Sequence, residues 1–210
     1  MGNTKQFFND YSVDFNSIYA TRGWFYRIID KFFRKSMRLR FEKTIENCEP
    51  IKDKTVFDVG CGPGHYSVLL AQMGAKKVLG IDFSDKMIEL ANQLAKEKQV
   101  TNNCQFLVKD IYDFKDEEFD FVILMGFMDY IKEPVSLIQQ IIKLTKEKAM
   151  FSFPVAEGIL AWQRKLRYKK KCPLYLYTRS DLNKLFDSLP NIEVSIEKIS
   201  RDYFVVISKK

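Results

Sequence analysis

A glycine-rich turn between a predicted buried strand and a predicted helix constrains this 210-residue chain more than any other feature. Residues 55–59 form a short apolar run, Gly60-Cys61-Gly62-Pro63-Gly64 follows directly, and a helical pattern begins at His65. Glycine has no Cβ and accepts positive φ angles, so a ligand can approach the backbone of such a turn closely. The N–H groups at the start of the next helix can bind an anionic group. The segment therefore predicts a ligand-binding strand–turn–helix unit.

Strand-like and helical patterns alternate along the rest of the chain, which is typical of a parallel α/β sheet. Strands are predicted at residues 55–59, 78–81, 104–108, 119–124, 149–153, 192–196 and 203–207. Helices are predicted at residues 65–73, 85–98, 133–145 and 180–189. Residues 12–48 form one long amphipathic helical region, or two helices separated near Gly23.

Two further acids follow the next two predicted strands. Asp82 ends the strand of residues 78–81 about 20 residues after the glycine turn, where a carboxylate can bind two ribose hydroxyls. Asp110 ends the strand of residues 104–108, where a carboxylate could accept a hydrogen bond from an adenine amino group. Because the carboxyl ends of parallel strands meet at one edge of the sheet, we expect these acids to share a crevice with the glycine turn.

Four ordered motifs together resemble the class I S-adenosylmethionine-dependent methyltransferases. They read DVGCGPGHYS (58–67), GIDFSDKMIELA (80–91), VKDIYDF (108–114) and FDFVILMGFMDYIKEP (119–134). A dinucleotide dehydrogenase would show GxGxxG, whereas this chain has DxGxGxG with Ser67 in place of the third glycine. The FSFP strand end and residues 199–204 are loosely similar to the magnesium-protoporphyrin and ubiquinone-pathway O-methyltransferases. The resemblance implies a Rossmann-like, mostly parallel sheet of seven strands with helices on both faces and an antiparallel last strand.

The resemblance also implies which residues bind S-adenosylmethionine. Its methionine part would be surrounded by Asp58, Gly60, Gly62 and Gly64. Its ribose would be bound by Asp82, and its adenine by Asp110 between Phe83 and Ile111. The other residues implied at the cofactor are Cys61, Met125, Tyr11 and Tyr19. One glycine turn combined with three acids indicates a cofactor site more specifically than the turn or any single acid does.

The acceptor side departs from the family pattern. Many such families carry a histidine after the fourth strand, and Tyr130 stands at that position here. A phenol with a reference pKa of about 10 is a poor base at neutral pH, so we expect Tyr130 and Asp129 to orient the acceptor. His65 is the third candidate catalytic residue, with helix capping as the alternative. Because the sulfonium is already activated, alignment for in-line displacement supplies much of the rate, with S-adenosylhomocysteine as product.

The flanking segments are predicted to cover this site. Residues 1–50 are interpreted as a helical lid on a methyltransferase domain of residues 51–210, with a cap insertion at about 154–177. Packing of the N-terminal helix on the sheet is equally open, and so is peripheral contact with a membrane surface, since Lys and Arg flank its apolar face.

Charge and cysteine content leave three function classes to compare. The net charge of +7 suits an acidic or apolar small-molecule or lipid-like acceptor and also a tRNA or rRNA methyltransferase. The fourth-strand segment lacks both the (D/N)PP(Y/F) element and the Pro-Cys nucleophile of nucleic-acid enzymes. A non-catalytic cofactor-binding module is the third class. The spacing of the four cysteines predicts neither a metal site nor a redox pair, and we expect a cytoplasmic protein.

Overall fold

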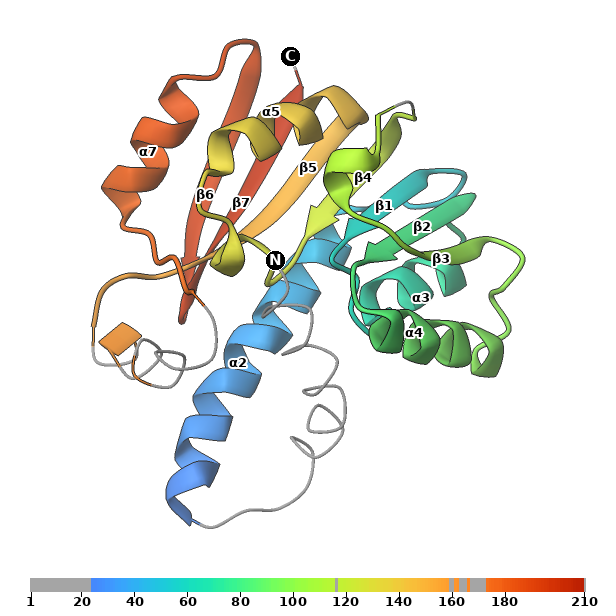
Figure 1. Ribbon diagram of the computed structural model, residues 1–210, viewed down its shortest axis with the longest axis horizontal. Coiled ribbons are helices and arrows are strands. Elements are labelled where there is room, and N and C mark those ends of the chain that lie inside the picture. The colour runs from blue at the N-terminus through green and yellow to red at the C-terminus, as the bar shows by residue number, and fades with distance from the viewer. Residues whose placement is uncertain (1–23, 116, 159–160, 163–165, 167–172, 210) are drawn as a thin grey trace.

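The computed structural model describes residues 24–115, 117–158, 161–162, 166 and 173–209, with side chains described from residue 35 onward. It contains one sheet of seven strands in the order β3-β2-β1-β4-β5-β7-β6 (Figure 1). The strands are β1 (Thr55–Val59), β2 (Lys77–Asp82), β3 (Cys104–Val108), β4 (Phe119–Leu124), β5 (Thr145–Pro154), β6 (Ile192–Ile199) and β7 (Asp202–Lys209). The helices include α2 (Trp24–Asn47), α3 (His65–Gln72), α4 (Asp85–Glu97), α5 (Pro134–Leu144) and α7 (Arg179–Asp187), with short 3-10 helices η1 (Ile111–Asp113) and η2 (Met128–Tyr130).

The direction of the strands confirms the predicted architecture. β1 pairs in parallel with β2 and β4, as do β2 with β3 and β4 with β5. β7 is antiparallel to both of its neighbours, β5 and β6, and is the one strand of this sheet that points the opposite way to the other six. The chain builds the sheet outward from β1 to β3 and then returns to place β4 on the other side of β1. A reversal of this kind leaves a crevice at the carboxyl ends of β1 and β4, where ligands of α/β sheets bind.

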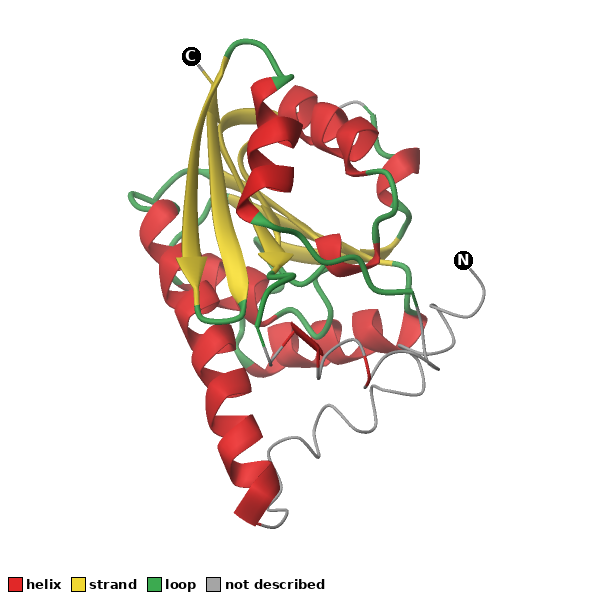
Figure 2. Cartoon of the chain, turned by 90° about the vertical axis from the view of Figure 1, so that its left-hand side faces the viewer, coloured by secondary structure: helices red, strands yellow, loops and turns green. Residues whose placement is uncertain are grey.

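Alternating side chains of the central strands divide the core into two layers. Phe57 and Val122 join α5 and α7 on one face, whereas Val56 and Ile123 join α3 and α4 on the other. Successive side chains of a strand point to opposite faces, so a strand buried on both faces reads as a continuous apolar run. Figure 2 shows helices on both sides of the strands, as predicted.

Element boundaries differ from the predicted ones mainly around β5. The strand begins at Thr145 rather than at 149, because α5 ends at Leu144 and Thr145 already has extended backbone angles. The polar residues 146–148 carry no strand pattern, yet Lys148 pairs with Phe121 and with Ser208 in the sheet. Tertiary pairing therefore extends this strand beyond its apolar run.

Helix α2 packs its C-terminal half against the sheet. Leu39 and Ile45 contact the second core layer, and Lys43 forms an ion pair with Glu197 of β6 at 2.7 Å. The described helix begins at Trp24, and residues 12–23 of the predicted helical region lie outside the described residues. The lid and cap functions of residues 1–50 and 154–177 stay predictions, as does membrane contact.

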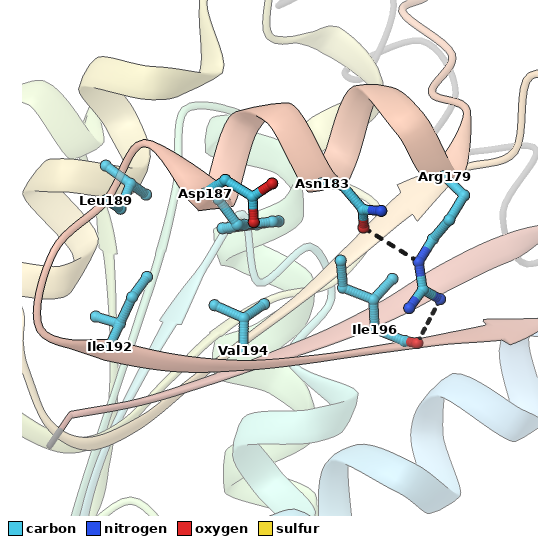
Figure 3. A pocket seen from close by; sticks show the side chains of 8 residues that line it. Arg179, Asn183, Asp187, Leu189, Ile192, Val194 and Ile196 are labelled. Carbon is cyan, nitrogen blue, oxygen red and sulfur yellow. Dashed lines mark hydrogen bonds between the residues drawn. The ribbon is translucent and has the colours of Figure 1, made fainter.

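A groove of about 340 Å³ lies between α7 and the edge strand β6 (Figure 3). Arg179 spans one end of it, donating from Nη1 to the Ile196 carbonyl at 2.7 Å and from Nε to the Asn183 side chain at 3.3 Å. β6 is the edge of the sheet opposite to β3, so this groove is separate from the acids that follow β2 and β3.

A reciprocal cap begins α7. The Thr178 hydroxyl accepts from the Asp181 N–H at 3.1 Å, and the Asp181 carboxylate accepts from the Thr178 N–H at 2.8 Å. We expect Thr178→Ala to lower the free energy of unfolding by about 1 kcal/mol, measured by urea titration. Thr178→Ser keeps the hydroxyl and should lose much less. Equal losses in the two variants would show that the cap does not stabilise α7.

Candidate active site

The glycine turn, residues 60–64, is fixed at the end of β2 by backbone hydrogen bonds. The N–H groups of Gly60 and Cys61 both donate to the carbonyl of Ile81, at 2.8 and 3.0 Å. Gly60, Gly62 and Gly64 all have positive φ, at 69°, 52° and 81°. Because residues with a Cβ rarely adopt this conformation, the turn requires glycine at each of these positions.

The three glycines differ in what lies beside them. A Cβ on Gly60 would lie 2.4 Å from the Phe127 ring, and a Cβ on Gly64 would lie 2.8 Å from the Phe106 ring. A Cβ on Gly62 would meet no atom of the described residues within 4 Å. Packing within the protein therefore excludes side chains at Gly60 and Gly64, whereas Gly62 faces open space through which a ligand can reach the turn.

Asp82 holds the glycine turn and the start of α4 together. One carboxylate oxygen accepts from the Gly62 N–H at 3.0 Å, and the other accepts from the Ser84 N–H at 2.9 Å. Burial raises the pKa of Asp82 above its ordinary value, although these N–H groups act in the opposite direction. Each carboxylate oxygen has a further lone pair, so Asp82 can also accept from the hydroxyls of a ligand.

Asp58 lies beneath the turn, with 1 % of its surface exposed. Its carboxylate accepts from the Ser67 hydroxyl at 2.6 Å, so Ser67 of α3 binds an acid where the dehydrogenase pattern has glycine. Burial, aided by the nearby Asp82 carboxylate, raises the pKa of Asp58 to about 7, against the lowering effect of the Ser67 hydrogen bond. Asp58 therefore joins β1 to α3 directly below the ligand-facing turn.

Asp58→Asn tests this elevated pKa. Folding raises the pKa of Asp58 above its unfolded value near 4, so its protonated form stabilises the fold. The free energy of unfolding of the wild type should therefore fall as the pH rises from about 4 to about 7. Asparagine still accepts from Ser67 but does not ionise. From pH 5 to pH 8 we expect the unfolding free energy of Asp58→Asn to rise relative to that of the wild type by roughly 2–3 kcal/mol. Parallel pH profiles in chemical denaturation would contradict the assignment.

Asp110 lies two residues beyond the end of β3, where it caps the N-terminus of η1. Its side chain accepts from the Tyr112 N–H at 3.1 Å, and it remains half-buried. Ile111 beside it is buried, and Phe83 at the end of β2 is half-buried. The registry of β2 with β3 pairs Asp82 with Val108, two residues before Asp110, so the two acids lie at the same edge of the sheet.

The acceptor-side residues lie on η2, immediately after β4. Asp129 is buried and Tyr130 half-buried. The segment of residues 173–178 crosses this helix: the Tyr175 N–H donates to the Asp129 carbonyl at 2.8 Å, and the Tyr177 hydroxyl donates to the Ile131 carbonyl at 3.4 Å. Burial, aided by Asp129, raises the pKa of Tyr177 to about 12. The sequence indicated only an irregular, aromatic segment here, because these contacts join residues more than 40 positions apart.

The remaining predicted residues are placed as follows. His65 is the first residue of α3 and is exposed, and loss of solvent on its protein side lowers its pKa. Cys61 is buried, which raises the pKa of its thiol well above the ordinary value and leaves it unreactive. Met125 is half-buried at the end of β4. Tyr11 and Tyr19 lie outside the described residues.

One polar cluster beside the site was missed by the sequence analysis. It consists of Ser36 and Arg40 of α2, Ser152 of β5 and Asp202 of β7. Arg40 was noted only as one of several basic residues between apolar ones. Its partners follow 112 and 162 positions later, and no local spacing connects them. Within the described residues, no group of three metal-ligating side chains occurs, and no helix is long and apolar enough to span a bilayer.

Comparisons with known proteins agree with this geometry. Residues 51–187 match the family model of the methyltransferase domain. The chain is 30 % identical over 157 residues to a ubiquinone biosynthesis O-methyltransferase of Neisseria meningitidis, covering 68 % of this chain and 63 % of that protein. It is 29 % identical over 148 residues to the enzyme of the same name from Coxiella burnetii, covering 70 % and 58 %. The chain thus matches somewhat less than two thirds of the length of these relatives.

Solved structures share the fold over nearly the whole chain. Magnesium protoporphyrin IX methyltransferase from Synechocystis PCC 6803, crystallised with S-adenosylhomocysteine, superimposes with a TM-score of 0.79 at 20 % identity, covering 99 % of this chain and 98 % of that one. An S-adenosylmethionine-dependent methyltransferase from Aquifex aeolicus gives a TM-score of 0.63 at 19 % identity, covering 82 % and 93 %. The matching family model, the strand order and the glycine turn all agree. This chain therefore belongs to the class I S-adenosylmethionine-dependent methyltransferases.

Proposed function

We propose that this chain binds S-adenosylmethionine and transfers its methyl group to a hydroxyl of a small-molecule acceptor. The observation that carries the proposal is the edge formed by Gly62, Asp82 and Asp110, where an open backbone position after β1 is followed along the sheet by carboxylates after β2 and β3. The names of the relatives support the oxygen acceptor and the small-molecule substrate class, since both are O-methyltransferases of ubiquinone biosynthesis.

The described residues fit this cofactor. Asp82 has lone pairs for ribose hydroxyls, Asp110 is half-buried beside the apolar Ile111 as an adenine site requires, and Gly62 admits a ligand to the turn. The buried Asp58 is partly ionised near pH 7 and can then add negative potential beneath the turn. When bound, S-adenosylmethionine supplies an activated methyl group. The protein then has to exclude water and align the acceptor oxygen.

The acceptor side of the site is aromatic rather than strongly basic. Phe127 and Tyr130 follow β4, and Tyr175 crosses η2. Flat aromatic side chains suit an acceptor that stacks on them. A hydroxyl on an aromatic ring has a pKa near 10, well below that of an aliphatic alcohol, so it loses its proton with little help. We therefore propose an aromatic hydroxyl acceptor that Tyr130 orients and Asp129 supports.

The test is methyl transfer from labelled S-adenosylmethionine to a panel of phenols, catechols, amines and bulk tRNA by the purified chain. We expect the label in the phenol or catechol fraction, with stoichiometric S-adenosylhomocysteine. Label confined to amines or to tRNA would overturn the acceptor class. Binding of S-adenosylmethionine without transfer to any acceptor would support the non-catalytic module. Residues 164–171 are rich in Lys and Arg, which together with the net charge of +7 favours the tRNA alternative, but they lie almost wholly outside the described residues. A cytoplasmic location stays a prediction.

A further inference from the structure

A buried polar cluster joins the N-terminal helix α2 to the carboxyl edge of the sheet. Ser36, Ser152 and Asp202 are all buried, and the Arg40 side chain is 13 % exposed. Each of these residues belongs to a different strand or to α2, so the cluster connects elements that are remote in sequence.

Three hydrogen bonds and one ion pair connect the cluster in a continuous path. The Asp202 carboxylate accepts from the Ser36 hydroxyl at 2.5 Å, and the same oxygen lies 3.6 Å from Arg40 Nε. Arg40 Nη1 donates to Ser152 Oγ at 3.3 Å. Ser152 Oγ also accepts from the Gly126 N–H at 2.7 Å. The position of Asp202 is thus transmitted through Arg40 and Ser152 to the backbone that follows β4.

That backbone joins the two halves of the candidate site. Gly126 has φ of +74°, and a Cβ there would lie 3.4 Å from Arg40 Nη1, so the guanidinium packs directly on this residue. The next residue, Phe127, covers Gly60 of the glycine turn, and η2 with Asp129 and Tyr130 begins immediately afterwards. A shift of Gly126 therefore moves residues on both the donor and the acceptor side.

The ionic character of this cluster requires a reason. Removing a carboxylate and a guanidinium from water is costly, and apolar residues of similar size often stabilise a core as well or better. The surrounding layer is apolar, with Met150 and Phe204 on the same strands as Ser152 and Asp202. A charged pair at this place is better explained by the orientation it imposes than by the stability it contributes.

We propose that Asp202 is a positioning residue, which holds the Arg40 guanidinium against Gly126 and so fixes the backbone at which methyl donor and acceptor meet. The inference rests on the proposed function for its kinetic consequence. The packing of α2 against the sheet is then required for the alignment of methyl donor and acceptor. The pair Lys43–Glu197 also joins α2 to the sheet, but it is more exposed and lacks a connection to Gly126 in the hydrogen bonds described.

The test compares Asp202→Asn, Arg40→Met and the double variant with the control Glu197→Gln. We expect each single variant to lower kcat/KM about 10-fold or more, since small misplacements of reacting groups are costly. Because Asp202 acts through Arg40, the double variant should be no slower than Arg40→Met alone. Glu197→Gln should stay within about twofold of the wild type. Multiplying losses in the double variant, or equal losses in Glu197→Gln, would overturn the positioning role.

A second measurement is independent of turnover. Hydrogen exchange of the Gly126 amide reports its bond to Ser152, and we expect Asp202→Asn to accelerate it while amides of β1 and β2 keep wild-type rates. Arg40→Met serves the same purpose if Asp202→Asn does not fold, because it removes the guanidinium through which Asp202 acts and leaves Ser152 in place. Accelerated Gly126 exchange without methyl transfer by the wild type would refute the proposed function alone. Unchanged exchange in both variants would refute the positioning role alone.

Discussion

Asp82→Ala is expected to weaken binding of S-adenosylmethionine by at least about 100-fold. The variant removes the acceptor of the Gly62 and Ser84 N–H groups and the carboxylate available to ribose hydroxyls. Hydrogen bonds to a charged group contribute roughly 1.5–3 kcal/mol each, and 1.4 kcal/mol corresponds to a tenfold change in affinity. Loss of two such bonds at the ligand already accounts for this factor. Calorimetric titration of S-adenosylmethionine and S-adenosylhomocysteine measures it.

Local loosening of the fold has to be separated from loss of the ligand contact. Ser84→Ala is a matched control, because Ser84 caps α4 by accepting from the Met87 N–H at 3.3 Å, next to Asp82. This variant should lose about 1 kcal/mol of unfolding free energy and retain binding within about threefold. Asp82→Asn keeps one acceptor oxygen and should bind with intermediate affinity. Wild-type affinity in Asp82→Ala would remove Asp82 from the site.

The strands, the helices and the order of the acids were predictable because they depend on local patterns. Burial on both faces gives β1 and β4 continuous apolar runs, and the carboxyl edge of a parallel sheet brings Asp82 and Asp110 together wherever such runs alternate with helices. The seven strand segments were read from these patterns, whereas their union in one sheet with an antiparallel β7 followed from the family resemblance. These features require no knowledge of which side chains meet in three dimensions.

The features that escaped prediction are tertiary contacts. Phe127 and Phe106 explain the glycines at 60 and 64 by packing, whereas the sequence suggested one ligand-binding role for all three glycines of the turn. Arg40 reads as one of many basic residues on a helix until Asp202 is beside it. Side chains that act across layers leave no periodic pattern, so their partners are visible only in the folded chain.

Gly62→Ala is expected to weaken cofactor binding by about 5-fold to 150-fold and to lower the free energy of unfolding by about 1–2 kcal/mol. The new methyl group would enter the open space beside the turn, because no atom in the described part of the chain lies within 4 Å of its position. Forcing a ligand against an extra methyl group typically costs 1–3 kcal/mol, which corresponds to about 5-fold to 150-fold in affinity. The φ of 52° adds a folding cost of about 1–2 kcal/mol, common to any alanine in this conformation.

Gly74→Ala separates these two effects. Gly74 follows the C-terminus of α3 with φ of 99°, and a methyl group added there would also have no protein atom within 4 Å, yet Gly74 lies away from the carboxyl edge of the sheet. We expect comparable losses of unfolding free energy in the two variants and unchanged affinity in Gly74→Ala, measured by thermal denaturation and calorimetry. Both alanines would have positive φ, so strain is common to the two variants. A loss of cofactor affinity in Gly62→Ala alone would show that the cofactor occupies the space beside Gly62. Equal cofactor affinities in Gly62→Ala and Gly74→Ala would mean that the cofactor approaches the sheet from elsewhere, and the glycine turn would then be a packing feature only.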